Sequence, residues 1–240
     1  AALTSGQANT ALGYSTLSTN QAGDYNTAVG HQVLQTFNAT DLGRNVGVGI
    51  NALNALGSGV ENTVVGSFAC DAFDNAESYN VAIGSDSMSG VDEGTAGGDA
   101  DFNVAIGYNA LLGGDFAGND RQLQGNIAIG SYALDATGTN AQTGTIAIGH
   151  QSLTALTSGA RNIAIGYQAL EDLTIGNDNI ALGYLALNGA SSHADCFANI
   201  AIGSYALDAL GANAAEKNIA IGYQAGSGVT TGDDNTIVGY

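Results

Sequence analysis

Acidic side chains crowd two long connecting segments of this sequence, residues 85–102 and 108–125, and are its best candidates for binding a ligand. Clustered carboxylates are the ligands that Ca²⁺ prefers, but the spacing matches neither an EF-hand loop nor the Gly-Gly-x-Gly-x-Asp calcium repeat. We therefore expect solvated loop charge, with Ca²⁺ as the one cofactor that these segments could bind. The candidate receptor contacts in these segments are Asp92, Glu93, Asp99, Asp101, Asp115, Phe116, Asp120 and Arg121.

Groups suited to catalysis are few. His193 lies near Asp195 and Cys196, but no second base or ligand set accompanies them, as a nucleophile or a metal site would require. His31 and His150 each follow a glycine at a place where equivalent segments carry Tyr or Ser, which indicates a structural position. We expect no catalytic, cofactor-binding or metal-binding residues and no enzyme activity.

The elements that position these loops are copies of a six-residue cassette, which occurs thirteen times. Its clearest copy is Asn162, Ile163, Ala164, Ile165, Gly166 and Tyr167. The second position is always β-branched, the fourth is Leu, Val or Ile, the fifth is Gly, and the third is usually Ala. Such residues suit a pleated strand, and a unit repeated this often indicates a solenoid. The fold class predicted is all-β, a parallel β-solenoid of about thirteen coils forming a β-roll.

Each coil is expected to have two short strands, because a second apolar segment, such as residues 167–170, follows each cassette glycine. Side chains alternate between the faces of a strand, so positions two and four share one face and position three lies on the other. We expect the large side chains to fill the core of the coil, and the Ala face to be covered by another copy. The leading Asn is either a member of a hydrogen-bonded ladder or a simple turn residue. Tyrosines after the glycine, such as Tyr167, Tyr184 and Tyr223, are expected to stack between coils.

Composition limits the partners. The net charge is −18, and the basic residues are only Arg44, Arg121, Arg161 and Lys217. This charge disfavours nucleic acid and anionic membranes as partners. No signal peptide or transmembrane segment is evident in the sequence, so membrane insertion is not expected. Residues 1–240 are expected to form a single solenoid domain, a segment of a longer protein.

Cys70 occupies a position that is Leu in other coils and is expected to be a core residue, whereas Cys196 lies in a connecting segment. Several coils would separate the two cysteines, so an intrachain disulfide is not expected.

The pattern Asn-Ile-Ala-Ile-Gly-Tyr-Gln-Ala-Leu, seen at residues 162–170, resembles the repeats of bacteriophage tail-fibre and virion-appendage proteins. It is also similar to the left-handed β-roll heads of trimeric autotransporter adhesins, which implies a left-handed β-roll here. The resemblance covers essentially the whole chain. It implies an extracellular homotrimer used for attachment to a cell-surface polysaccharide or protein receptor. The spacing between cassette glycines, 17 to 23 residues, favours the phage fibre over the adhesin head.

Two other functions fit the sequence less well. A fibre-borne glycan depolymerase would need paired carboxylates at a catalytic separation, and no sequence feature fixes such a pair. An ice-binding solenoid would need a regular outward array, commonly of Thr, whereas Thr occupies the second cassette position only at Thr10, Thr27, Thr63 and Thr236.

Overall fold

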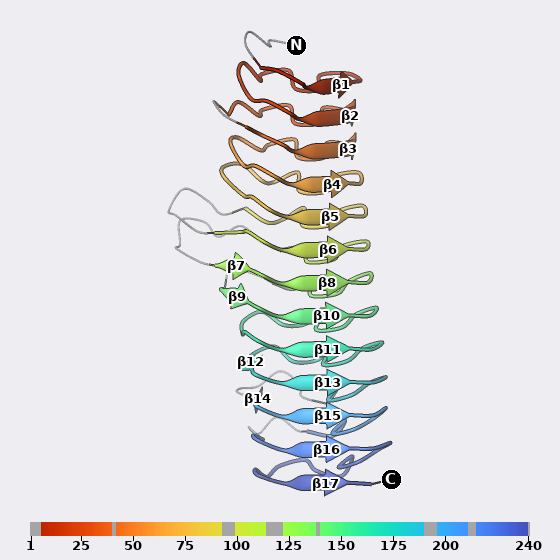
Figure 1. The fold of residues 1–240 in the computed structure, drawn as a ribbon. Coiled ribbons are helices and arrows are strands. Elements are labelled where there is room, and N and C mark those ends of the chain that lie inside the picture. Colours follow the sequence, from red (N-terminus) through yellow and green to blue (C-terminus); the bar gives the residue numbers. More distant parts are fainter. Residues whose placement is uncertain are drawn as a thin grey trace. The chain divides into compact units, whose positions relative to one another are not determined.

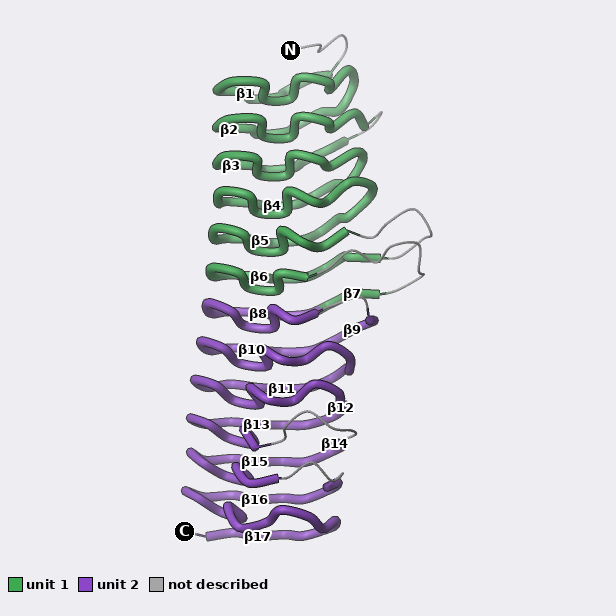
Figure 2. The backbone as a smooth tube through the Cα atoms, turned by 180° about the vertical axis from the view of Figure 1, so that it is seen from behind, with its two compact units in different colours: residues 1–125 green, residues 126–240 purple. Residues whose placement is uncertain are grey.

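The structure, a computed structural model, describes residues 6–39, 42–92, 99–113, 122–137, 140–189, 196–210 and 215–239. All regular secondary structure in these ranges is β-strand, and parallel strands stack as a β-solenoid (Figure 1). The chain divides into two compact units, residues 1–125 and 126–240 (Figure 2). The boundary directly precedes the cassette that begins at Asn126. The same repeat builds both units, and a single domain stays a prediction.

In the first unit, six cassette strands pair in parallel and in chain order. They are β1 (Thr10–Leu12), β2 (Thr27–His31), β3 (Val46–Ile50), β4 (Thr63–Val65), β5 (Val81–Ile83) and β6 (Val104–Ile106), and the two-residue strand β7 (Leu123–Gln124) follows them. Equal cassette positions lie opposite one another, as in Thr10 and Thr27. The register is therefore the register of the sequence repeat.

The second unit has seven cassette strands, which pair in the same parallel manner. They are β8 (Ile127–Ile129), β10 (Ile146–Ile148), β11 (Ile163–Ile165), β13 (Ile180–Leu182), β15 (Ile200–Ile202), β16 (Ile219–Ile221) and β17 (Thr236–Val238). Two-residue strands precede three of them: β9 (Gln142–Thr143), β12 (Gly176–Asn177) and β14 (Cys196–Phe197), of which β12 pairs with β14.

The orientation of the cassette strands is opposite to the sequence prediction. Ala164 and its equivalents Ala82 and Ala181 are completely buried, whereas Ile165 is 40% exposed. The core is filled mainly from the opposite wall, by Leu170, Leu173 and their equivalents. Large side chains on that wall leave little space at position three, which is Ala in most cassettes, although Val64 is also completely buried there. The expectation that the Ile and Val side chains fill the core was wrong.

The second predicted strand, such as residues 167–170, is a turn. Gln168 and Leu170 both have left-handed backbones, with φ of 53°. This conformation places two consecutive side chains, Ala169 and Leu170, in the core, which the alternation of a strand would forbid. Left-handed residues with a Cβ cost about 1–2 kcal/mol each. Hydrogen bonds between turns offset this cost, because Gln168 donates to the His150 carbonyl at 3.0 Å and Leu170 donates to the Ala186 carbonyl at 3.0 Å.

The cassette asparagines form a hydrogen-bonded ladder, the first of the two roles expected for them, and all are buried from Asn26 to Asn218. The Asn179 amide nitrogen donates to Asn162 Oδ1 at 3.0 Å and to the Cys196 carbonyl at 2.7 Å. The backbone N–H of Asn199 donates in turn to Asn179 Oδ1 at 3.0 Å. Each amide therefore joins its own turn to both neighbouring turns.

Candidate functional site

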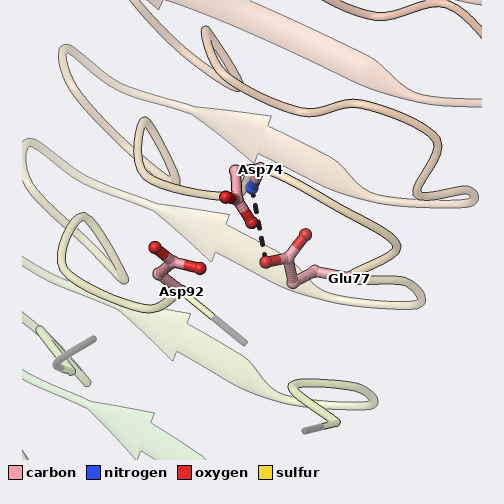
Figure 3. Close-up of side chains that lie close together, drawn as sticks. All are labelled: Asp74, Glu77 and Asp92. Carbon is pink, nitrogen blue, oxygen red and sulfur yellow. Dashed lines mark hydrogen bonds between the residues drawn. The ribbon is translucent and has the colours of Figure 1, made fainter. Parts of the chain in front are cut away.

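Asp74, Glu77 and Asp92 form the one group of three potential metal ligands that the described residues contain (Figure 3). One ligand atom from each lies within 4.8 Å of the other two. Asp74 and Glu77 belong to the turn between β4 and β5, and Asp92 follows the turn after β5. Glu77 is completely buried, Asp74 is exposed and Asp92 is half-buried.

Glu77 already serves the turn that contains it. Its carboxylate accepts the backbone N–H of Asn75 at 3.1 Å and that of Asp74 at 3.4 Å, and the second bond is drawn in Figure 3. A buried carboxylate needs such donors because burial penalises an unpaired charge. The cluster therefore organises a turn, and its geometry alone does not assign a bound cation.

Buried charge in this region also affects a neighbouring thiol. Cys70 is completely buried, as the sequence predicts for a core position, Cys196 is also buried, and the two cysteines form no disulfide. Burial raises the pKa of the Cys70 thiol, and the nearby carboxylates of Glu77 and Asp71 raise it further. Cys70 is therefore a protonated core residue rather than a nucleophile.

Of the eight predicted receptor contacts, the structure describes three. Asp92 joins the cluster, and the backbone carbonyl of Asp99 accepts the N–H of Leu123 at 2.8 Å. Asp101 Oδ1 accepts the N–H of Ser78 at 2.7 Å, and burial raises the pKa of this carboxyl group. The other five contacts lie outside the described residues: Glu93, Asp115, Phe116, Asp120 and Arg121.

The sequence prediction missed Asp74 and Glu77. Glu77 stands three residues before the cassette Asn80, where other turns have Gly59, Ala100 or Gly176. A carboxylate in a column that is mostly Gly or Ala was the signal that could have identified it.

The outer face of the cassette strands is an exposed apolar surface in each unit. Its exposed members are Leu12, Val65 and Ile83 in the first unit, and Ile165, Ile221 and Val238 in the second. In-register pairing places equivalent side chains in straight rows along each sheet, as for Ile165 and Leu182. No cassette in the sequence has Asp, Glu, Lys or Arg at position two, four or six, although His31 and His150 occupy position six. We call these rows the apolar strand face.

A locally neutral row of residues flanks the apolar strand face, at the position before each cassette Asn. At three places in this row, a basic residue is followed one turn later by an acidic residue. Arg44 bonds Glu61 at 2.6 Å and Arg161 bonds Asp178 at 2.6 Å, while Lys217 precedes Asp234 by the same interval. The flanking row therefore has no net charge, although the chain carries −18.

Aromatic rings after the cassette glycine contact one another, as the sequence predicts. His31 stacks on Tyr14 with ring centroids 5.1 Å apart, and His150 stacks on Tyr167 at 5.3 Å. Tyr167 stacks on Tyr184 at 5.6 Å. Stacked rings turn their faces toward each other and their edges outward, so this row is a poor platform for sugar rings. His193, the remaining histidine, lies outside the described residues.

A helix able to cross a membrane is not found in the described part of the chain. Comparisons with protein-family models, with curated proteins and with solved structures found no match for this chain.

Proposed function

We propose that this chain is a rigid segment of an extracellular attachment fibre, most specifically a phage tail fibre, which works as a homotrimer. In this proposal three parallel copies bury their apolar strand faces against one another. The connecting loops remain outside and contact a cell-surface polysaccharide or a protein receptor. A trimeric adhesin head on a bacterial surface would use the same architecture.

The observation that carries the proposal is the apolar strand face with its neutral flank. Contiguous exposed apolar surface of this kind is typical of interaction sites. Each row repeats at the spacing of parallel strands, about 4.8 Å. A second copy of the chain offers rows of the same spacing, so its side chains match over every turn rather than at one point.

The charge distribution supports the same partner. Two copies with a net charge of −18 repel each other over most of their surfaces. The apolar strand face and its flanking row carry no net charge, so this is the surface by which copies can approach at the lowest electrostatic cost. The remaining negative charge would keep assembled fibres apart in solution.

The attachment role can be tested by binding the fluorescently labelled chain to a panel of bacterial strains. We expect binding to particular strains and competition by their soluble surface polysaccharide or by protease treatment of the cells. A matched variant with Asp92, Asp99 and Asp101 changed to Ser should bind more weakly if these loops contact the receptor. Binding that requires no surface component, or no binding by a correctly assembled trimer, would contradict the attachment role.

A further inference from the structure

One turn of the second unit departs from the repeat at three buried positions. Thr137 stands where equivalent turns have Leu156 or Leu173, and Gln142 stands where they have Gly159 or Gly176. Thr145 replaces the cassette asparagine. All three residues are at most 1% exposed. Each leaves a side-chain oxygen without a hydrogen-bond partner: Thr137 Oγ1, Gln142 Oε1 and Thr145 Oγ1.

Thr145 also interrupts the asparagine ladder. Its backbone N–H still donates to Asn126 Oδ1 at 2.9 Å, but it has no amide oxygen to offer the next turn. At an intact step, the backbone N–H and the Nδ2 of Asn179 both donate to Asn162 Oδ1, at 3.1 and 3.0 Å. At the interrupted step, Asn162 Nδ2 donates to the Gly176 carbonyl at 2.7 Å but finds no amide oxygen at residue 145. The backbone N–H of Asn162 therefore has no acceptor among the described residues.

The three altered positions meet at one place in the core. In the equivalent turn, a Cβ added to Gly176 would lie 3.1 Å from Leu173 Cδ1 and 3.1 Å from Asn179 Nδ2. Thr137, Gln142 and Thr145 occupy the positions of Leu173, Gly176 and Asn179, respectively. The pairing of β10 with β11 keeps the register of the repeat, with Ile146 opposite Ile163. The three residues that carry the orphan oxygens therefore surround one point of the core.

We propose that this point is an internal binding site for ordered water. Water is the ligand class that fits the unpaired groups, because it can accept a hydrogen bond from the Asn162 N–H and donate one to Gln142 Oε1. The hydroxyl groups of Thr137 and Thr145 can each donate a hydrogen bond to water or accept one from it. A cation could not pair with the N–H, and an anion could not pair with the amide oxygen. Buried waters typically make about three hydrogen bonds to groups that would otherwise be unpaired. The site also fixes the end of Gln142, whose Nε2 donates to the Leu156 carbonyl at 2.8 Å.

The test is a high-resolution crystal structure of the chain, together with magnetic relaxation dispersion of the water signal, which counts long-lived internal waters in solution. We expect water density within hydrogen-bond distance of at least two of the three oxygens. The triple variant Thr137→Leu, Gln142→Gly, Thr145→Asn restores the repeat and should lose this density and at least one long-lived water. If the triple variant does not fold, Thr145→Asn alone should show the ladder bond to Asn162 and a higher melting temperature.

A matched control is Leu173→Thr, which places a single hydroxyl in an intact turn beside Gly176. It should lower the melting temperature, because its hydroxyl has no polar companions. Direct hydrogen bonds among Thr137, Gln142 and Thr145, without intervening density, would overturn the proposal. An unchanged number of long-lived waters in a folded triple variant would overturn it as well.

Discussion

At the scale of the residue, the amide of a cassette asparagine is the smallest unit that joins successive turns. Asn179 donates to Asn162 and to the Cys196 carbonyl, and it accepts from the backbone N–H and the Nδ2 of Asn199. It is completely buried, so water cannot replace any of these partners without entering the core. The amide thus links the folding of one turn to that of its neighbours.

Asn179→Ala should therefore lower the free energy of unfolding substantially. Each buried group left unpaired costs about 1–3 kcal/mol, and this substitution leaves at least two. Denaturant unfolding monitored by circular dichroism measures the change. Gln224→Ala is the control, because Gln224 is exposed and its backbone bond to Ser204 would remain. Equal stability of the two variants would show that the ladder contributes nothing.

Half-buried carboxyl groups give a second prediction at the residue scale. Burial raises the pKa of Asp71, and the charge of Asp86 raises it further against the opposing effect of a backbone N–H. The Asp71 carboxyl group therefore stays protonated in the folded state at pH values where it has lost its proton in the unfolded state. The free energy of unfolding must then rise as the pH falls through the pKa of Asp71 in the folded state. The rise continues toward the pKa of Asp in the unfolded state, about 3.9.

We expect the unfolding midpoint in denaturant to be higher at about pH 5 than at pH 7. Asp101, Asp135, Asp172 and Asp208 act in the same direction, and Asp178, whose pKa is lowered by Arg161, opposes them. Asp71→Asn should reduce the difference between the unfolding midpoints at the two pH values. The size of that reduction is the contribution of Asp71. A difference that is unchanged in Asp71→Asn would contradict the assignment.

At the scale of the element, the cassette glycine ends each strand at a place where adjacent backbones touch. Gly166 has φ of 141°, and a Cβ added to it would collide with the carbonyl oxygen of Gly183 in the next turn. Backbone cannot move aside as a flexible side chain can. The same contact recurs along the column, as between Gly149 and Gly166.

Gly166→Ala should therefore destabilise the fold by several kcal/mol, more than the roughly 1 kcal/mol that separates Gly from Ala by intrinsic preference. Gly228→Ala is the matched control, since a Cβ there would meet nothing within 4 Å. Melting temperatures of the two variants give the comparison. Similar melting temperatures would mean that turns can separate enough to admit a methyl group.

The repeat made the element order and the register predictable, because thirteen near-identical cassettes can pair only in parallel and in step if they stack. The orientation of the strand was not predictable from apolar content alone, since both faces are apolar. The width of the core decides it: Leu170 and Leu173 fill the interior, so Ala164 and not Ile165 faces inward. Alternation fails in the segment 167–170, which indicates a corner or bulge, but the turn at Gln168 and Leu170 could not be placed because left-handed backbone is rare outside glycine.

The acidic cluster was only partly predictable for a related reason. Asp92 stands in a visibly acidic segment, whereas Glu77 is brought to it by the stacking of turns fifteen residues apart in sequence. The sequence shows which residues are charged, but the lengths of the connecting segments determine which charges meet.

At the scale of the whole molecule, the central claim is that the apolar strand face is an interface between copies. Ile165→Lys places a charge in the middle of that face without altering the core, because Ile165 points outward. We expect this variant to fold but to remain a single chain. Asp172→Lys, on an exposed turn, is the control and should assemble normally.

The most direct measurement is the solution mass of the unmodified chain by light scattering coupled to size-exclusion chromatography. We predict a solution mass of about 72 kDa, three times the 23.9 kDa of one chain. A mass of 23.9 kDa at micromolar concentration would leave the apolar strand face uncovered in solution. That result would contradict the trimeric fibre.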